Sequence, residues 1–317
     1  MGSMLVLALG LTGCQQTPPV PQKPASEAIA DAIKSSENVK SSSFNIALKG
    51  DINAPKGETP SKVSMNLTIS GNADSSSPKE PKANMKMTGV LSADQDSGKA
   101  DLELRINKDA LYANIATLTG TGMFNVPAEA SQFLGKWWKF SIPAGSFDDA
   151  ATKYLQGDAA LTPQEKQVKD YFESGKIFTD VKFVGIEGNT HHYSATLDKK
   201  GLADFVVLAA ESQGTKVTDA EKKDMQTQLA PLEMSIDMYV DRATGMISRL
   251  SGPVSYKEPV MGATAAFTYD ITVGDFNKPV TVEVPANAME VPLGGMMGTP
   301  VMGTPVMTST DSEVVVQ

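Results

Sequence analysis

Apolar and polar residues alternate along most of the chain from Ser42 onward, which is the pattern of strands that bury one face. In the first run, apolar residues occupy every second position from Phe44 to Leu48. The same period of two returns in further runs at 63–69, 85–91, 102–106 and 111–115. Because short polar turns join these runs, they predict an antiparallel meander with one apolar face.

A second series of strands is predicted in the later part of the chain. Residues 134–140 form a strand that carries both tryptophans, and neighbours on a strand point to opposite faces, so Trp137 and Trp138 should face opposite sides. A hairpin over 177–197 follows, with its turn at Gly188. Three more alternating runs lie at 234–240, 247–256 and 267–273.

Helices are predicted in three places, one before the first strand and two between later strands. Ser26 can cap a first helix. The insertion at about 146–174 predicts two helices, and the second begins at Thr162 with proline in its first position. The insertion at about 199–230 predicts another pair, whose second helix opens with a capping-box pattern at 218–221.

Neither end of the chain shows these periods. Residues 1–13 contain an apolar run too short to cross a bilayer as a helix, and they are interpreted as an export signal cleaved before Cys14. The alternative is a buried N-terminal strand with an incidental free cysteine. Residues 14–25 are rich in proline and predict an extended tether. Residues 286–317 contain a repeated Gly-Thr-Pro-Val-Met and predict a disordered tail.

Composition and charge narrow the possible partners. The formal charge of −9 and the isoelectric point near 4.9 argue against nucleic acid and against electrostatic docking on anionic lipid headgroups. A single cysteine cannot form an internal disulfide, so the chain must fold by packing alone. Arginine occurs only at positions 105, 242 and 249, which leaves no cluster for binding phosphate. Any membrane attachment therefore has to occur through Cys14.

No sequence pattern indicates catalytic residues, a cofactor or a metal site. There is no nucleophile elbow, phosphate-binding glycine loop or His-Glu-x-x-His motif. His191 and His192 are adjacent, so on a strand they point to opposite faces, and each is interpreted as a lone surface side chain. The acidic turn from Asp94 to Asp96 lacks the later oxygen ligands of a calcium loop and is interpreted as a hairpin turn.

Methionine and aliphatic residues gather on the predicted apolar face of the sheet. One interpretation is a solid core beneath the helices. The other is that part of this face lines a cavity for a hydrophobic ligand, because unbranched methionine adapts to irregular apolar guests. The residues concerned are Met65, Leu67, Met85, Met87, Leu102, Leu104, Ile106, Met234, Ile236 and Met238.

Several short segments resemble those of known bacterial lipoproteins. Leu11-Thr12-Gly13-Cys14 looks like a lipobox, and this resemblance implies that Cys14 becomes a lipid-modified N-terminus. The order of tether, helix, meander, inserted helices and late strands makes about residues 26 to 286 similar to the LolA-like and LppX/LprG-like lipoproteins. The segments that carry the similarity are 109–114, 134–139, 238–245 and 277–285.

The resemblance implies an α+β fold, in which a strongly curved antiparallel sheet forms a half-barrel and helices cover its concave face. Residues 26–285 would form this single domain. The similarity also implies a lipid or acyl-chain ligand in the lumen and a carrier role outside the cytoplasm, at the membrane that holds Cys14. We expect a monomer and leave protein partners open. The alternative is a non-catalytic envelope module for interaction or scaffolding, with a solid core.

Overall fold

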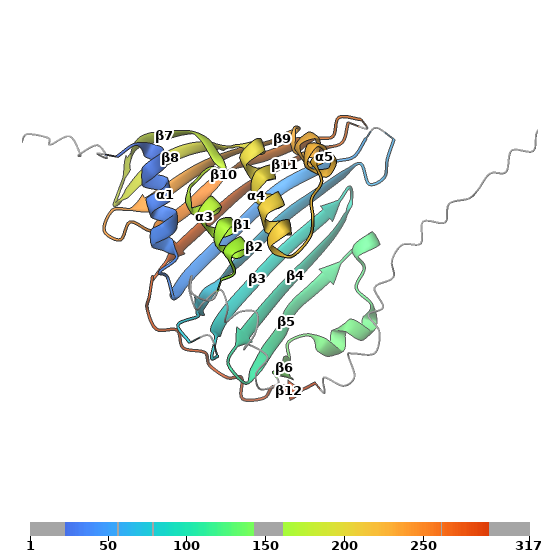
Figure 1. The fold of residues 1–317 in the computed structure, drawn as a ribbon. Helices are drawn as coiled ribbons and strands as arrows, with labels where there is room; N and C mark the ends of the chain where they lie inside the picture. The colour runs from blue at the N-terminus through green and yellow to red at the C-terminus, as the bar shows by residue number, and fades with distance from the viewer. Residues whose placement is uncertain (1–22, 56, 78, 143–160, 261, 292–317) are drawn as a thin grey trace, which may run out of the picture.

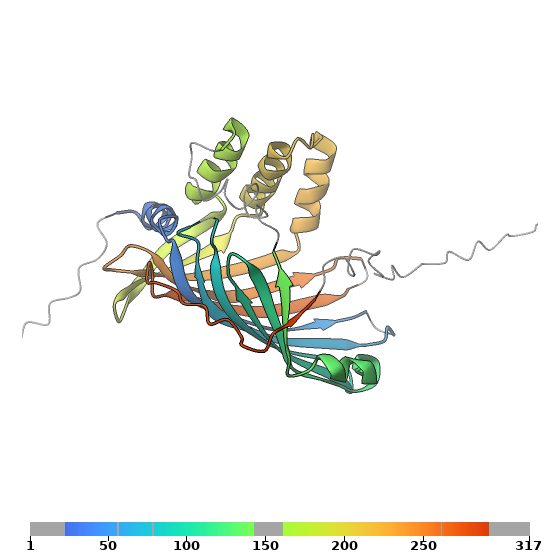
Figure 2. The same cartoon turned by 90° about the horizontal axis from the view of Figure 1, so that it is seen from below.

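The computed structural model describes residues 23–55, 57–77, 79–142, 161–260 and 262–291. These residues form one strongly curved sheet with helices on its concave side (Figures 1 and 2). The predicted α+β half-barrel is therefore confirmed. The predicted signal, most of the tether, the first part of the 146–174 insertion and the tail from residue 292 lie outside the described residues.

The first five strands form the predicted antiparallel meander. Each strand pairs with the next one along the chain. The chain then passes through two short 3-10 helices, η1 (Gly122–Phe124) and η2 (Ala128–Phe133), into a further strand, β6 (Trp137–Ser141). The meander consists of β1 (Ser41–Asn53), β2 (Lys62–Asp74), β3 (Lys82–Ala93), β4 (Asp96–Ile106) and β5 (Ala110–Gly120).

Five later strands extend the same sheet from its other side. They are β7 (Phe178–Glu187), β8 (Thr190–Leu197), β9 (Leu232–Asp241), β10 (Ile247–Lys257) and β11 (Thr264–Gly274), and the short β12 (Met289–Glu290) lies beside β6. Because β11 pairs with β1, the strand order is β12-β6-β5-β4-β3-β2-β1-β11-β10-β9-β8-β7. All these neighbours are antiparallel except β12 and β6, which are parallel.

The described helices are α1 (Ala25–Ser36), α3 (Pro163–Glu173), α4 (Lys199–Ser212) and α5 (Asp219–Leu229). Two of them begin with capping boxes, and the one in α5 is the capping box that the sequence predicts. In α3 the N–H of Glu165 donates to Thr162 Oγ1 at 3.2 Å, and the N–H of Thr162 donates to the Glu165 carboxylate at 2.7 Å. Residues 218 and 221 repeat this exchange in α5. Within the described residues, none of the helices is long and apolar enough to cross a bilayer.

Cross-strand pairing gives the sheet one continuous apolar face. Residues that lie opposite each other in neighbouring antiparallel strands share a face. One row of such neighbours crosses most of the sheet and contains almost only large apolar side chains. From β8 to β5 this row is Tyr193, Met238, Leu250, Ile271, Ile46, Ile69, Met87, Leu102 and Ile115.

Helix α1 packs on this apolar face at β8 and β9 and so identifies it as the concave side. Ile29 and Ile33 of α1 form a buried cluster with Tyr193, Ile236 and Met238. The residues that alternate with these along each strand therefore face the opposite, convex side, which we call the polar face.

The segment between β11 and β12 ties the middle of the sheet to its β6 edge. The Asn84 amide donates to the carbonyl of Thr281 at 2.9 Å, and the Arg105 guanidinium donates to the carbonyl of Glu283 at 2.7 Å. Figure 2 shows this red segment passing the ends of the central strands. Because β12 then pairs with β6, the folded chain continues past the predicted start of the tail.

Strand β10 carries a proline inside the sheet, where its missing N–H interrupts the ladder. Gly252 and Pro253 have no partners in β9, although the residues on either side of them do. The Ser235 carbonyl in β9 accepts a hydrogen bond from the Tyr269 hydroxyl at 3.3 Å. Gly252 permits this arrangement, because a Cβ at that position would lie 2.0 Å from the same carbonyl oxygen.

Burial raises the pKa of Tyr269 to about 12, so its hydroxyl remains a donor at ordinary pH. We expect Tyr269→Phe to lower the free energy of unfolding by about 1 kcal/mol, because the Ser235 carbonyl loses its donor. Urea unfolding measures this change. Tyr256→Phe is the matched control, since the Tyr256 hydroxyl makes no hydrogen bond to any described residue. Equal losses in the two variants would contradict the role of Tyr269.

Candidate functional site

The residues predicted to line a cavity all lie on the helix-facing side of the sheet, as their cross-strand partners show. The structure divides them into two groups with different surroundings. Met234, Ile236 and Met238 belong to β9. The other group is on β2, β3 and β4 and consists of Met65, Leu67, Met85, Met87, Leu102, Leu104 and Ile106.

The β9 group lies beneath α1 in a solid core. Ile236 is 5% exposed and Met238 is 1% exposed, and both belong to the cluster that contains Ile29 and Ile33. Met234 packs against the same cluster from its edge. At this end of the sheet, the core interpretation of the methionine stripe is therefore the better one.

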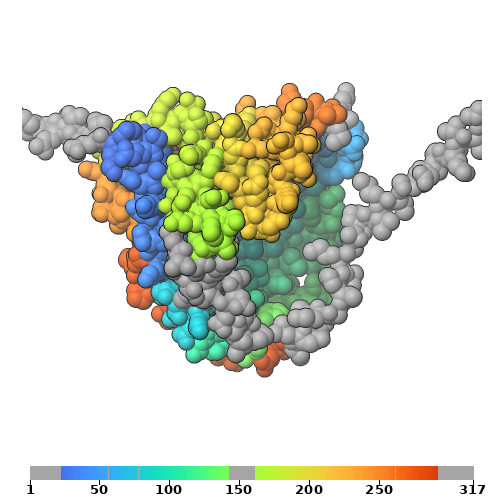
Figure 3. Space-filling model, viewed as in Figure 1, coloured from blue at the N-terminus to red at the C-terminus, as the bar shows by residue number. Residues whose placement is uncertain are grey.

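The group on β2, β3 and β4 is only half-buried and belongs to no buried cluster within the described residues. Nearby Leu91 is 37% exposed. Figure 3 shows the green surface of β4 and β5 recessed beside α3 and α4. An apolar sheet face that the described helices leave open in this way is typical of a binding surface.

A hollow of about 350 Å³ lies on this part of the concave face, and we call it the trough. One cross-strand row of apolar residues forms its floor, with Leu67, Gly89, Ala100 and Leu118 in neighbouring strands. The two small residues in the middle of this row make the floor concave. The remaining apolar lining of the trough comes from Met65, Val90, Leu91, Gly98 and Phe124.

Glycine shapes the trough at two positions. A Cβ on Gly89 would lie 3.7 Å from Leu67 Cδ1, so the space above Gly89 is open. At the end of the trough, a Cβ on Gly120 would lie 1.9 Å from the Phe124 carbonyl oxygen, so glycine is needed there for η1 to approach β5. The sequence interpretation missed Gly89 and Ala100 because it followed large apolar residues. Small residues in phase with the apolar stripe were the available signal.

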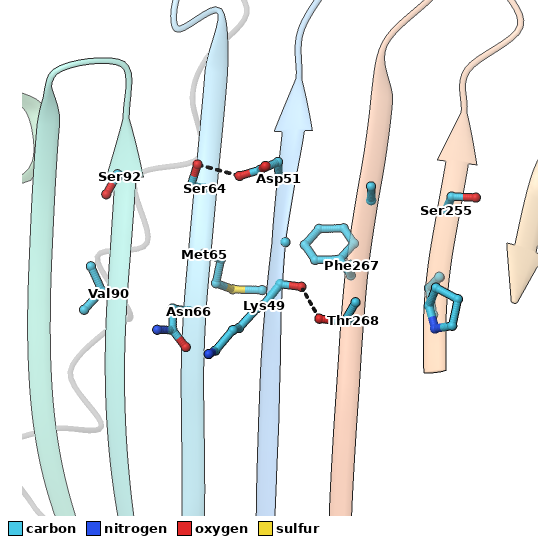
Figure 4. A pocket seen from close by; sticks show the side chains of 14 residues that line it. Lys49, Asp51, Ser64, Met65, Asn66, Val90, Ser92, Ser255, Phe267 and Thr268 are labelled. Atoms are coloured by element: carbon cyan, nitrogen blue, oxygen red, sulfur yellow. Dashed lines mark hydrogen bonds between the residues drawn. The ribbon is translucent and has the colours of Figure 1, made fainter. Parts of the chain in front are cut away.

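The polar face holds a larger hollow of about 530 Å³, shown in Figure 4, which we call the polar-face groove. It crosses five neighbouring strands, from β3 to β10. The Ser64 hydroxyl donates to the Asp51 carboxylate at 2.6 Å within it. Its lining mixes charged, hydroxyl, amide and apolar side chains, so it suits a different ligand from the trough.

The two histidines of β8 lie on opposite faces, as predicted, but neither is a lone surface side chain. His191 is on the helix-facing side, where its ring makes edge contacts with Phe183 and Tyr193 at centroid distances of 5.8 and 6.3 Å. Burial, together with the charge of Arg242, lowers the pKa of His191. This imidazole is therefore part of an aromatic cluster beside the core.

His192 is on the polar face, is 9% exposed and connects three strands. Its Nε2 is 2.9 Å from the Asp237 carboxylate in β9, and its ring stacks on Tyr239 at 4.4 Å. Its Nδ1 lies 2.8 Å from Glu187 Oε1 in β7, without hydrogen-bond geometry. The interpretation of His192 as an isolated surface residue was wrong, because neighbours on adjacent strands enclose it.

The tryptophans of β6 also face opposite sides, as predicted. Trp137 is on the polar face beneath Arg105, whose guanidinium carbon is 4.6 Å from the ring centroid. Trp138 is on the helix-facing side, 5.3 Å from the ring of Phe133, and its indole N–H donates to the Phe133 carbonyl at 3.3 Å. Both indoles therefore serve local packing.

The acidic turn between β3 and β4 is the predicted hairpin turn. Asp94 accepts hydrogen bonds from the Ser61 hydroxyl at 2.8 Å and from the N–H groups of Ser61 and Lys62, both at 3.1 Å. These hydrogen bonds, led by the one from the Ser61 hydroxyl, lower the pKa of Asp94. No group of three or more potential metal ligands occurs in the part of the chain that the structure describes.

No protein-family model matches the chain, and no curated protein matches it. Among solved structures, it is similar to a DUF1329 family protein from Desulfovibrio piger, with 8% identity, a TM-score of 0.19 and coverage of 82% of this chain and 95% of that one. It is also similar to the LolA superfamily protein NE2245 from Nitrosomonas europaea, with 9% identity, a TM-score of 0.16 and coverage of 80% and 95%.

A third similar structure is MucB in complex with MucA, with 10% identity, a TM-score of 0.12 and coverage of 80% of this chain and 94% of that one. A LolA superfamily protein is thus among the structures that the chain resembles, as the sequence predicted. TM-scores of this size carry no argument about function, which has to come from the chain's own residues.

The two halves of the apolar face should differ in how much they contribute to stability. We expect Met238→Ala to lower the free energy of unfolding by about 2–5 kcal/mol, because it leaves a cavity in the core beneath α1. Met87→Ala, at a half-buried position in the same cross-strand row, should cost about 1 kcal/mol or less. Chemical denaturation of both variants measures this difference. Similar losses would show that β3 is packed as tightly as β9.

Proposed function

We propose that the protein binds a hydrophobic ligand, such as an acyl chain, in the trough and does not convert it chemically. One observation carries this proposal. Beneath α1 the apolar face is buried to 1% exposure at Met238, whereas across β2 to β5 the same face stays half-buried except at Ala83 and Ala93, near the two ends of β3. Leaving apolar side chains in water costs free energy, and covering them with a ligand recovers it.

The size and lining of the trough suit a single hydrocarbon chain. Its volume of about 350 Å³ lies at the lower end of the range for small-molecule sites, which is roughly 300–1,000 Å³. Each buried methylene contributes about 0.8 kcal/mol, so ten methylenes would supply about 8 kcal/mol before the costs of association. Because its floor consists of Leu67, Gly89, Ala100 and Leu118, affinity should depend on chain length more than on the headgroup.

We also propose that the protein is an extracytoplasmic lipoprotein, anchored to the membrane by acyl chains on Cys14. The support for this part is the lipobox-like sequence Leu11-Thr12-Gly13-Cys14 and the proline-rich tether after it. These residues lie outside the described part of the chain. The described fold begins with α1 directly after the tether, which would place the trough close to a supply of lipid.

The second candidate is a non-catalytic module for interaction or scaffolding in the envelope. The solid cluster beneath α1 favours it, since that half of the sheet leaves no room for a ligand. The two candidates differ at the β2–β5 half of the face. A scaffold needs no ligand there, whereas a lipid-binding protein does.

Filling the trough should abolish ligand binding without harming the fold. We expect Gly89→Leu to reduce binding of the neutral probe N-phenyl-1-naphthylamine by at least about tenfold, because the new side chain would occupy the open space beside Leu67. Probe fluorescence during titration into the chain from Gln15 onward measures the affinity. Mass spectrometry of organic extracts should find copurified lipid in the unsubstituted protein and much less in the variant.

Gly185→Leu is the matched control for this experiment. It makes the same substitution in β7, at a glycine where a Cβ would meet nothing within 4 Å. We expect it to bind the probe like the unsubstituted protein. Equal binding by Gly89→Leu and Gly185→Leu, or an unsubstituted protein that extracts without lipid, would favour the scaffolding module.

Lipid anchoring is tested separately at Cys14. We expect Cys14→Ser to move the protein from the membrane fraction to the soluble fraction, because serine offers no thiol for acylation. Fractionation followed by mass spectrometry of the N-terminal peptide measures this change. A membrane-bound Cys14→Ser protein, or an unmodified Cys14 in the unsubstituted protein, would contradict the anchor and leave the trough proposal unaffected.

A further inference from the structure

The polar-face groove lies on the opposite side of the sheet from the trough and continues into a second hollow. The adjoining hollow is about 440 Å³ and shares Lys49, Pro253 and Thr268 with the groove. The two hollows therefore form one depression over the central strands. The depression extends to Gly252 and Pro253 of β10, which have no pairing partners in β9.

Small side chains create this depression. Two rows of cross-strand neighbours line the groove, and Figure 4 shows side chains from both rows. The first row contains almost only small residues and runs through Ser92, Ser64, Asp51, Ala266 and Ser255. The second row stands beside it and runs through Val90, Asn66, Lys49, Thr268 and Pro253.

The charged side chains that line the two hollows are three carboxylates and one ammonium group. Asp51 and Asp270 already have cationic partners, and Asp237 has a hydrogen bond to His192, so each carboxylate already has a partner within the chain. The pairs are Asp51 with Lys62 at 3.0 Å, Asp270 with Arg249 at 2.6 Å and Asp237 with His192 at 2.9 Å.

Lys49 is the exception among these groups. Its ammonium has no ion pair and no hydrogen bond to any of the residues that the structure describes. Figure 4 shows its side chain lying across β2 toward Asn66. The Asn66 amide and the Thr268 hydroxyl stand on either side of it, and Val90 and Pro253 add apolar surface. An unpaired cation beside neutral donors and apolar surface suits an organic anion.

We propose that the polar-face groove is a second binding site, which takes a small organic anion with an apolar body and holds its charged group at Lys49. The site lies across the sheet from the trough and shares none of the trough's floor residues, although Met65, Asn66 and Val90 line both hollows. It therefore does not depend on the proposed function. The chemistry is that of a carboxylate or sulfonate group joined to a ring or a short hydrocarbon.

A matched pair of fluorescent probes separates the two sites. 8-Anilinonaphthalene-1-sulfonate has the same ring body as N-phenyl-1-naphthylamine and carries one additional sulfonate. In the chain from Gln15 onward with Gly89→Leu, the trough is filled, so the neutral probe should no longer bind while the anionic probe still does. Adding Lys49→Met to this chain should weaken binding of the anionic probe by at least about tenfold.

Two controls accompany this substitution. Lys49→Arg keeps the positive charge in place and should retain the affinity for the anionic probe. Lys182→Met removes the same charge from β7, where Lys182 is exposed and also has no ion pair within the described chain. It should leave the affinity unchanged.

Ala266→Leu keeps Lys49 but fills the groove, so it should also weaken binding of the anionic probe.

An unchanged affinity in Lys49→Met, or an equal loss in Lys182→Met, would overturn the proposal. Circular dichroism of each variant shows whether the sheet is intact. The two proposals can fail independently. If the neutral probe never binds but the anionic probe depends on Lys49, the trough proposal fails and the second site stands. If the neutral probe binds and Lys49→Met leaves the affinity for the anionic probe unchanged, the second-site proposal fails and the trough proposal stands.

Discussion

The packing of α1 against β8 and β9 is the contact on which the rest of the structure depends. The residues that make this contact include the largest fully buried side chains of the described residues, Ile29, Tyr193 and Met238. Helix α1 precedes the meander in sequence but packs on strands from the later series. Together with the pairing of β1 and β11, this contact joins two series of strands into one sheet.

The position of this core also explains the open half of the apolar face. A single short helix covers only a few strands, whereas the apolar row continues across β1 to β5. Helices α3 and α4 pack on each other through aromatic contacts, with Phe172 and Phe205 at 6.0 Å, and Phe172 remains 42% exposed. The surface that α1 does not cover is the surface on which the trough lies.

Both proposed sites arise from small residues in strands. On the helix-facing side, Gly89 and Ala100 lower the floor between Leu67 and Leu118. On the polar face, Ser64 and Ala266 flank the strand that carries Lys49. Because the side chains at these positions are small, the sheet has an apolar hollow on one side and a charged hollow on the other. The two would then select ligands of different chemistry.

The sequence by itself determined the strands, the capping box of α5 and the opposite faces of Trp137 and Trp138, because these follow from local backbone geometry. It also placed the methionine stripe on a single face. Only the tertiary structure decided that Met238 is core while Met87 stays half-buried, because burial depends on where α1 docks. Register between distant strands likewise decided the enclosure of His192 and the isolation of Lys49, since no local pattern encodes which residues become cross-strand neighbours.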